Sequence, residues 1–173
     1  SHRVAVERFR LNQLNLVREV SAQIANALSV TELSKRVTEL IQKTFHYYYV
    51  AIFTLRDNSS SLRFRASAMP KGSRKGRRKR VGWEVEIGQG LVGQAAAGGE
   101  RILVPDVQKD TRYRFVDALR ETRSEVVIPL KIEGRVLGVL DVQSDQLDAF
   151  HPNDLLVLEA LALVAVGVVF DTF

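Results

Sequence analysis

The chain has 173 residues, 46% of them hydrophobic, which is enough to bury one substantial core and short for two independent domains. It has no cysteine, which excludes disulfides, thiolate metal sites, thiol nucleophiles and thioether-linked cofactors. The formal net charge is +5, but residues 71–80 hold seven Lys or Arg and no acid, so the basic character is local. No charged, apolar and small-residue signal opens the chain, which favours a soluble cytoplasmic protein.

Two helices are expected before the first strand. The first places apolar side chains at the three-four spacing of a helical seam, at Leu14, Val17, Ile24 and Leu28. Ser29 and Glu32 fit the capping box of a second helix, which ends near Phe45. We therefore divide the chain into an N-terminal signalling and dimerisation helix over 1–28 and one domain over 29–173.

Two strands are expected next. Residues 49–55 are β-rich and apolar on both alternating faces, as a central strand requires, and a polar turn over 57–61 follows. From residue 62 apolar and polar residues alternate, which indicates a half-exposed strand. Its inward side chains are expected to be Leu62, Phe64, Ala66 and Ala68.

The basic loop over 71–80 admits two interpretations. As an electrostatic patch, it would contact nucleic-acid phosphates or an anionic membrane surface. As a solvated connection between two strands, it would bind neither. We favour the solvated connection, because a nucleic-acid-binding domain spreads its positive charge over a whole face.

A glycine-rich turn lies between a short strand expected over 83–87 and a short helix over 91–97, and another short strand is expected over 101–104. The dinucleotide-binding pattern GxGxxG is matched by Gly88, Gly90 and Gly93. We interpret these as structural glycines, because a helix of about two turns is too short to cross between parallel strands. The strand before them also carries acids, whereas the first strand of a dinucleotide-binding unit is buried and apolar.

Residues 124–144 are the clearest structural signal in the chain, because they form two apolar strands closed by a tight polar turn. Alternate residues of both strands are apolar, and Glu133-Gly134 supplies the reversal. The other faces carry Val127, Leu137 and Val139, so we expect helices to cover both sides of the sheet.

The chain closes with an apolar helix expected over 152–171, with Pro152 in its first turn. The uncharged part, 160–170, spans only about 17 Å as a helix against about 30 Å for a bilayer core, so we expect no membrane span. A helix that is apolar on all sides must be buried on all sides. We therefore expect this helix and the N-terminal helix to pack against a second copy of the chain.

Side chains suited to catalysis are scattered along the sequence. His46 and His151 lie at the ends of elements, where packing or helix capping explains them. Asp106, Asp110 and Asp117 are too loosely spaced in one loop to define a metal site. We therefore expect no catalytic residue, no metal and no enzyme activity.

Three segments together resemble successive blocks of a GAF domain, and the resemblance covers residues 29–170. They are GQGLVGQAAAGGERILVPDVQKDTRYRF, TRSEVVIPLKIEGRVLGVLDVQS and AFHPNDLLVLEALA. The resemblance implies an α+β fold, a GAF-like three-layer α/β/α sandwich with a central six-stranded antiparallel sheet and long N- and C-terminal helices. It also implies a sensory module whose terminal helices commonly build a dimer interface.

Comparison with the sequence patterns of this family narrows the range of ligands to be expected. Cysteines are used by the members that attach a linear tetrapyrrole and by the members that reduce free methionine sulfoxide. Because this chain has no cysteine, we expect neither a covalent bilin nor that reduction. The cofactor, if any, is left unknown. Cyclic-nucleotide-binding members carry an Asn-Lys pair, a Phe and an Asp-Glu pair. Phe150 and Asp154 match, whereas Ser144, Asp145 and Leu155 depart from this pattern, which argues against a cyclic nucleotide.

The pocket of such domains lies between the sheet and the loops after the second and fourth strands. The resemblance gives six candidate ligand-binding residues, Trp83, Asp106, Arg112, Tyr113, Phe115 and Arg123. Their rings and guanidinium groups would suit a planar or anionic small molecule. The alternative is that the rings close a core beneath the loops and the arginines are solvated.

Our preferred hypothesis is a non-catalytic sensory and regulatory domain of a bacterial signalling protein such as a sensor histidine kinase. The domain would bind a small molecule, form a homodimer, and relay a signal through its terminal helices to a covalently linked output domain. One alternative is a ligand-free dimerisation module. The last is an enzyme that holds a nucleotide on the glycine-rich turn.

Overall fold

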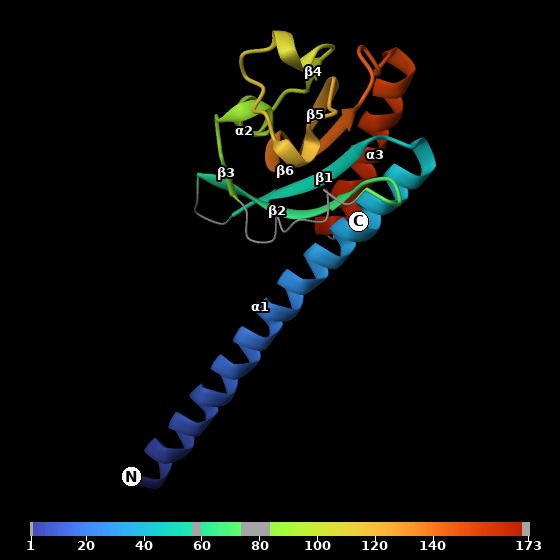
Figure 1. Ribbon diagram of the computed structural model, residues 1–173. Coiled ribbons are helices and arrows are strands. Elements are labelled where there is room, and N and C mark those ends of the chain that lie inside the picture. The colour runs from blue at the N-terminus through green and yellow to red at the C-terminus, as the bar shows by residue number, and fades with distance from the viewer. Residues whose placement is uncertain (1, 57–59, 74–83, 171–173) are drawn as a thin grey trace.

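Six strands make one antiparallel sheet in the part of the chain that the structure describes. The computed structural model describes residues 2–56, 60–73 and 84–170. The strands are β1 (Tyr49–Leu55), β2 (Ser61–Ala68), β3 (Glu84–Glu86), β4 (Ile102–Val104), β5 (Ser124–Ile132) and β6 (Arg135–Ser144). They follow the spatial order β3-β2-β1-β6-β5-β4 with antiparallel neighbours (Figure 1). This confirms the expected six-stranded antiparallel sheet.

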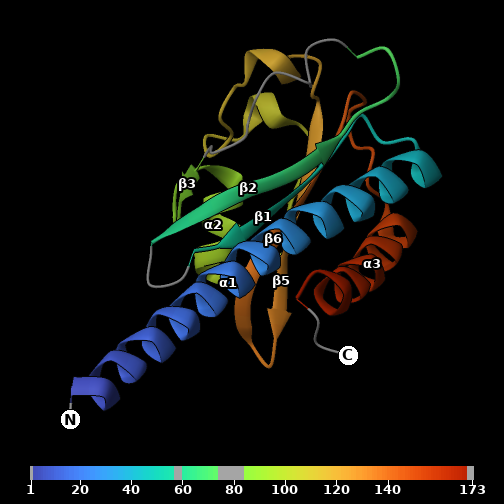
Figure 2. The ribbon, with the colours of Figure 1, turned by 90° about the horizontal axis from the view of Figure 1, so that it is seen from below.

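Helices cover both faces of the sheet. α1 (His2–Phe45) and α3 (Pro152–Phe170) lie side by side on one face (Figure 2). The other face carries α2 (Gly90–Gly98) and two short 3-10 helices, η1 (Val107–Lys109) and η2 (Asp117–Leu119). The GAF-like three-layer α/β/α sandwich expected from the sequence is confirmed.

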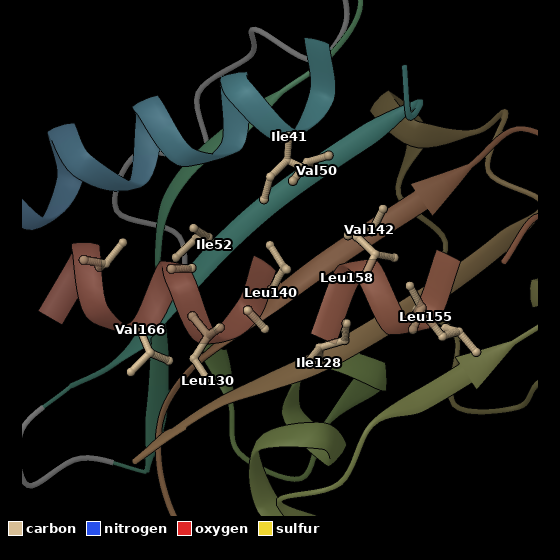
Figure 3. Close-up of a cluster of buried hydrophobic side chains, with 14 of the residues drawn as sticks. Ile41, Val50, Ile52, Ile128, Leu130, Leu140, Val142, Leu155, Leu158 and Val166 are labelled. Atoms are coloured by element: carbon tan, nitrogen blue, oxygen red, sulfur yellow. The ribbon is translucent and has the colours of Figure 1, made fainter. Parts of the chain in front are cut away.

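The larger of the two cores lies between the sheet and α3. Alternation along β1, β5 and β6 directs one set of side chains to this face, including Ile52, Ile128 and Leu140, which are at most 1% exposed. Leu158 of α3 packs into the middle of this set, and Ile41 of α1 closes its edge (Figure 3). The hairpin that gave the clearest sequence signal thus builds much of this core.

The second core lies on the α2 side of the sheet. It contains the alternate residues of the same strands, such as Phe53, Val127 and Val139, together with Leu91 and Ala95 of α2. Both faces of the central strands are therefore buried, as their apolar sequences predicted.

The long helix α1 corrects one expectation. The sequence predicted a break at residue 29, but α1 runs without interruption from His2 to Phe45. Residues 21–30 contain neither Gly nor Pro, so nothing in them stops a helix. Glu32, assigned to a capping box with Ser29, instead makes an i,i+4 ion pair with Arg36, with 3.6 Å between Oε1 and Nε.

The N-terminal half of α1 projects beyond the sheet (Figure 1). Its apolar side chains are exposed, Leu14, Val17 and Ile24 among them. On α3, Leu156 and Leu163 are 71% and 69% exposed, so only one side of this helix is buried within the single chain. The second copy of the chain, which the sequence predicted at these helices, stays a prediction.

α3 has the length and the apolar composition of a helix that can cross a membrane. Its inner side, with Leu155, Leu158, Ala162 and Val166, belongs to the core of the domain. A buried core helix has the same length and composition, so this property is weak evidence for a membrane.

Two expectations fall on residues that the structure does not describe. These are the interpretation of the basic loop beyond Ser73 and the placement of the candidate Trp83.

Candidate functional site

A cavity of about 250 Å³ lies between the sheet and the start of α2. Its wall is formed by β3, the turn into α2 and the first turn of that helix, the segment from Tyr113 to η2, and inward residues of β1, β5 and β6. Its polar lining residues are Glu84, Glu86, Gln89, Tyr113, Arg114, Glu125, Asp141 and Gln143. This size suits a small metabolite rather than a drug-sized molecule.

The inner wall carries two buried carboxylates joined by one amide. Glu125 is 3% and Asp141 2% exposed. The amide nitrogen Nε2 of Gln143 donates to Oδ2 of Asp141 at 2.8 Å and to Oε2 of Glu125 at 3.3 Å. The hydroxyl of Thr122 donates to Oε1 of Gln143 at 2.7 Å, which fixes the orientation of the amide. We refer to Glu125, Asp141 and Gln143 as the acidic floor.

Strand periodicity explains why these three side chains share one face. Glu125 pairs with Gln143, and Val127 with Asp141, across the β5–β6 ladder. All lie on the α2 side, the same side as the buried Val127 and Val139. Sequence reasoning missed them, although the sequence did contain a signal: acids at inward positions of a hairpin that is otherwise apolar.

The acidic floor places two carboxylates at the inner wall of the cavity. Burying two carboxylates side by side is unfavourable, because each loses hydration and repels the other. The amide of Gln143 is one partner of both carboxylates, and each carboxylate has further interactions within the chain. A ligand with an ammonium group placed in the cavity would add both donors and charge.

The segment from Pro105 to Leu119 contributes Tyr113, Arg114, Val116 and Leu119 to the lining, and two of its aspartates hold its turns. The Asp106 carboxylate accepts from the backbone N–H of Gln108 at 3.1 Å and caps η1. Asp110 binds Arg112 bidentately, with Nε–Oδ1 2.9 Å and Nη2–Oδ2 2.7 Å, and accepts from its backbone N–H at 2.9 Å. The hydrogen bonds from Arg112 hold the pKa of Asp110 below its usual value, and Asp110 raises the pKa of Arg112.

The side chain of Arg114 lies beside the N-terminal end of α2. Its Nη2 donates to Oε1 of Gln89, the N-cap residue, at 3.0 Å. Its side-chain carbons pass close to Gly90, where a Cβ would lie 3.4 Å from Cδ of Arg114. Gly90 and the next two residues of α2 line the cavity, so the positive end of the helix dipole faces it.

The structure brings only one of the six residues predicted for the pocket to this cavity, among those it describes. Tyr113 lines the wall. Asp106 and Arg112 are engaged within their own loop, as described above, and Phe115 is 68% exposed. Arg123 lies outside the lining, and its backbone joins Val107 and Ser144 by hydrogen bonds of 2.9 Å and 2.8 Å.

The glycine-rich turn has a structural explanation. A Cβ on Gly93 would lie 2.3 Å from the carbonyl oxygen of Glu86, so only glycine allows α2 to approach β3 this closely. The N–H of Gly88 also donates to the carbonyl of Gly93 at 2.8 Å. Within the described ranges, no three His, Cys, Asp or Glu side chains gather in a way that could hold a metal ion.

Comparison with known proteins identifies relatives of two kinds. A family model described as "GAF domain" matches residues 27–166. "GAF domain-containing protein A" of Dictyostelium discoideum is 30% identical over 132 residues, which are 76% of this chain and 72% of that protein. "Free methionine-R-sulfoxide reductase" of Saccharomyces cerevisiae is 37% identical over 79 residues, 45% of this chain and 43% of that protein.

A solved structure supports the same relationship. Free methionine-R-sulfoxide reductase from Neisseria meningitidis, in complex with its substrate, superposes with a TM-score of 0.66 and 27% identity, covering 82% of this chain and 77% of that one. These reductases overturn the expectation that the chain is not an enzyme, because they are enzymes with this fold and with detectable sequence similarity. The expectation relied on the absence of cysteine and of a catalytic constellation in the sequence, and the relatives show that this fold also serves catalysis.

Proposed function

Because the chain belongs to the GAF domain family, we propose that it is a sensory domain that binds a small molecule with an ammonium group in the cavity between the sheet and α2. The acidic floor carries this proposal. Two buried carboxylates that line a small cavity favour a cation, and a shared amide holds them in fixed positions.

The relatives support a free amino acid as the class of ligand. The yeast and Neisseria proteins are named for free methionine-R-sulfoxide, which carries an α-ammonium group. The resemblance in fold and sequence makes this molecule and its parent, L-methionine, the natural first probes. The planar or anionic ligand expected from the sequence is less compatible with the floor, because a purely anionic molecule would meet two further negative charges there.

A thermal-shift screen tests the proposal. Free L-amino acids and L-methionine-R-sulfoxide should raise the melting temperature, since a ligand that binds only the folded state stabilises it. N-acetylated forms, which lack the ammonium group, should not. Asp141→Asn should abolish the shift, whereas Asp145→Asn, the same change at an exposed site at the end of β6, should leave it intact. A screen in which no ammonium compound shifts the melting temperature would rule the proposal out.

Turnover of the bound ligand is a second candidate function, favoured by the reductase relatives. The chain has no cysteine, so any reduction of a sulfoxide would need electrons from an external donor. Incubation with L-methionine-R-sulfoxide and dithiothreitol, followed by measurement of free methionine, tests it. Methionine formation above the rate of the protein-free mixture would support it, and formation at the protein-free rate would exclude it for this donor.

We also propose that binding is relayed through the terminal helices of a homodimer to a covalently linked output domain, in a cytoplasmic bacterial signalling protein such as a histidine kinase. α1 supports this, because one uninterrupted helix joins the side of the sheet to the exposed apolar segment. Two helix arrangements with different ligand affinity are needed for such a relay.

A further inference from the structure

We propose that the middle of α1 is held to β2 by a weak polar contact and can part from the sheet while the rest of the domain stays folded. The inference goes beyond the proposed function, because it concerns the motion of α1 and not the ligand of the cavity. It gives the proposed relay the moving element that such a relay needs.

Two neighbouring stripes of α1 face the domain, and their chemistry differs. One stripe packs against the larger core and is apolar, with Val30, Leu33, Val37 and Ile41. The other follows it one residue later and is polar, with Thr31, Ser34, Thr38 and Gln42. Both have the three-four spacing of one side of a helix. We refer to the second set as the polar stripe.

β2 meets the polar stripe with polar side chains of its own. α1 lies next to this strand (Figure 2). Leu62 and Phe64 of β2 belong to the second core, on the other face of the sheet. The alternate residues therefore lie on the side of α1, and they are Arg63, Arg65 and Ser67. Contact between two polar surfaces removes little apolar area from water, which is the main source of stability for a packed helix.

One member of the polar stripe is buried without a partner. Ser34 is 0% exposed, and its hydroxyl has no hydrogen-bond partner among the residues that the structure describes. A hydroxyl that loses water without a replacement destabilises the packed position of the helix. Thr38 is equally buried, but its hydroxyl donates to the carbonyl of Lys35 in its own helix at 2.9 Å and adds no bond to the sheet.

Arg65 links the polar stripe to the sheet. Its Nη1 donates to Oγ1 of Thr31 at 3.1 Å, and its Nε donates to Oγ1 of Thr54 on β1 at 2.7 Å. Both acceptors are neutral, so these bonds are weaker than those of an arginine to a carboxylate. Burial, together with the nearby charge of Arg63, lowers the pKa of Arg65, which means that its charge is disfavoured at this position. Parting of α1 from β2 returns this guanidinium to water.

Hydrogen exchange of the full chain, followed by mass spectrometry, tests the inference. Backbone amides of residues 31–42 in α1 should exchange at least about tenfold faster than those of residues 155–166 in α3, because the local opening exposes α1 alone. A homodimer through the terminal helices protects both segments, so the comparison holds in either oligomeric state.

Three substitutions on the polar stripe separate its contributions. Thr31→Val removes the acceptor of Arg65 and keeps the shape of the side chain, so it should speed exchange in residues 31–42 about threefold or more and leave α3 unchanged. Thr38→Val, the matched control, removes a hydroxyl that bonds within α1 and should not speed exchange. Ser34→Ala removes the unpartnered hydroxyl and should slow exchange in this segment.

Equal exchange of the two helices in the wild type would overturn the inference. A Thr31→Val variant that exchanges no faster in α1 would do the same, as would one in which both helices speed up equally, since the substitution would then act on the whole fold. All these measurements are made without ligand. Their failure therefore leaves the proposed ligand site intact, and failure of the ligand screen leaves this inference intact.

Discussion

Two glycines of α2 differ in what surrounds them, and this difference predicts opposite effects of the same substitution. A Cβ on Gly93 would lie 2.3 Å from the carbonyl oxygen of Glu86, whereas a Cβ on Gly98 would meet nothing within 4 Å. Gly93→Ala should lower the free energy of unfolding by about 1–3 kcal/mol through overpacking. Gly98→Ala should leave it unchanged or raise it by up to about 1 kcal/mol. Urea unfolding measures both, and equal effects would contradict the close approach of α2 to β3.

The ion pair between Asp110 and Arg112 predicts a pH dependence of stability. The pKa of Asp110 is lowered in the folded protein by its hydrogen bonds to Arg112. Its contribution is therefore present above the ordinary pKa of an aspartate and is lost as the pH falls through the lower folded value. Asp110→Asn should destabilise the protein more at pH 7 than near pH 3. Urea unfolding at the two pH values tests this, and an equal loss at both would contradict the assigned ion pair.

The residues predicted for the pocket and the residues that line the cavity differ for a physical reason. Arg112 and Phe115 have the chemistry of ligand-binding groups, but the loop uses Arg112 to bind Asp110 and leaves Phe115 exposed. Glu125 and Asp141 looked like ordinary members of a hairpin, since alternation shows which face a residue shares but not whether that face is filled or hollow. Only the position of α2 above the sheet reveals the cavity.

Two polar residues, one inside α1 and one at the start of α3, allow a matched test of where these helices begin. Ser29 lies inside α1, so Ser29→Ala should change the free energy of unfolding by less than about 0.5 kcal/mol. Asp154 accepts the backbone N–H of His151 at 2.9 Å at the start of α3, so Asp154→Ala should cost about 0.5–2 kcal/mol. Thermal unfolding followed by circular dichroism compares the two. A loss for Ser29→Ala as large as for Asp154→Ala would indicate that the long helix is capped and interrupted.

Most elements were predictable because local sequence and packing agree. β1 has the predicted bounds, the hairpin of β5 and β6 turns at Glu133-Gly134, and α3 begins at Pro152. The predicted break in α1 was wrong because a capping box requires a non-helical residue at its first position, and residues 21–30 contain no Gly or Pro that would end the helix there. A local signal of two residues was therefore not enough to end the helix.

The exposed apolar sides of α1 and α3 predict that the whole molecule self-associates in solution. Leu156 and Leu163 lie one above the other on α3, seven residues apart, and both are about as exposed as Phe115 on the far side of the sheet. Leu163→Glu should convert a dimer to a monomer in sedimentation velocity at tens of micromolar, whereas Phe115→Glu should not. A monomeric wild type at that concentration would contradict the proposed dimer.

The central claim is that the acidic floor binds an ammonium group. Its most direct test is calorimetric titration of L-methionine-R-sulfoxide into the wild type and into Asp141→Asn, which removes one floor charge and keeps the size of the side chain. We predict saturable binding to the wild type and a loss of affinity of at least about tenfold in the variant, the effect of a charge-assisted hydrogen bond. Binding of equal affinity to both proteins, or no saturable binding to the wild type, would contradict the account.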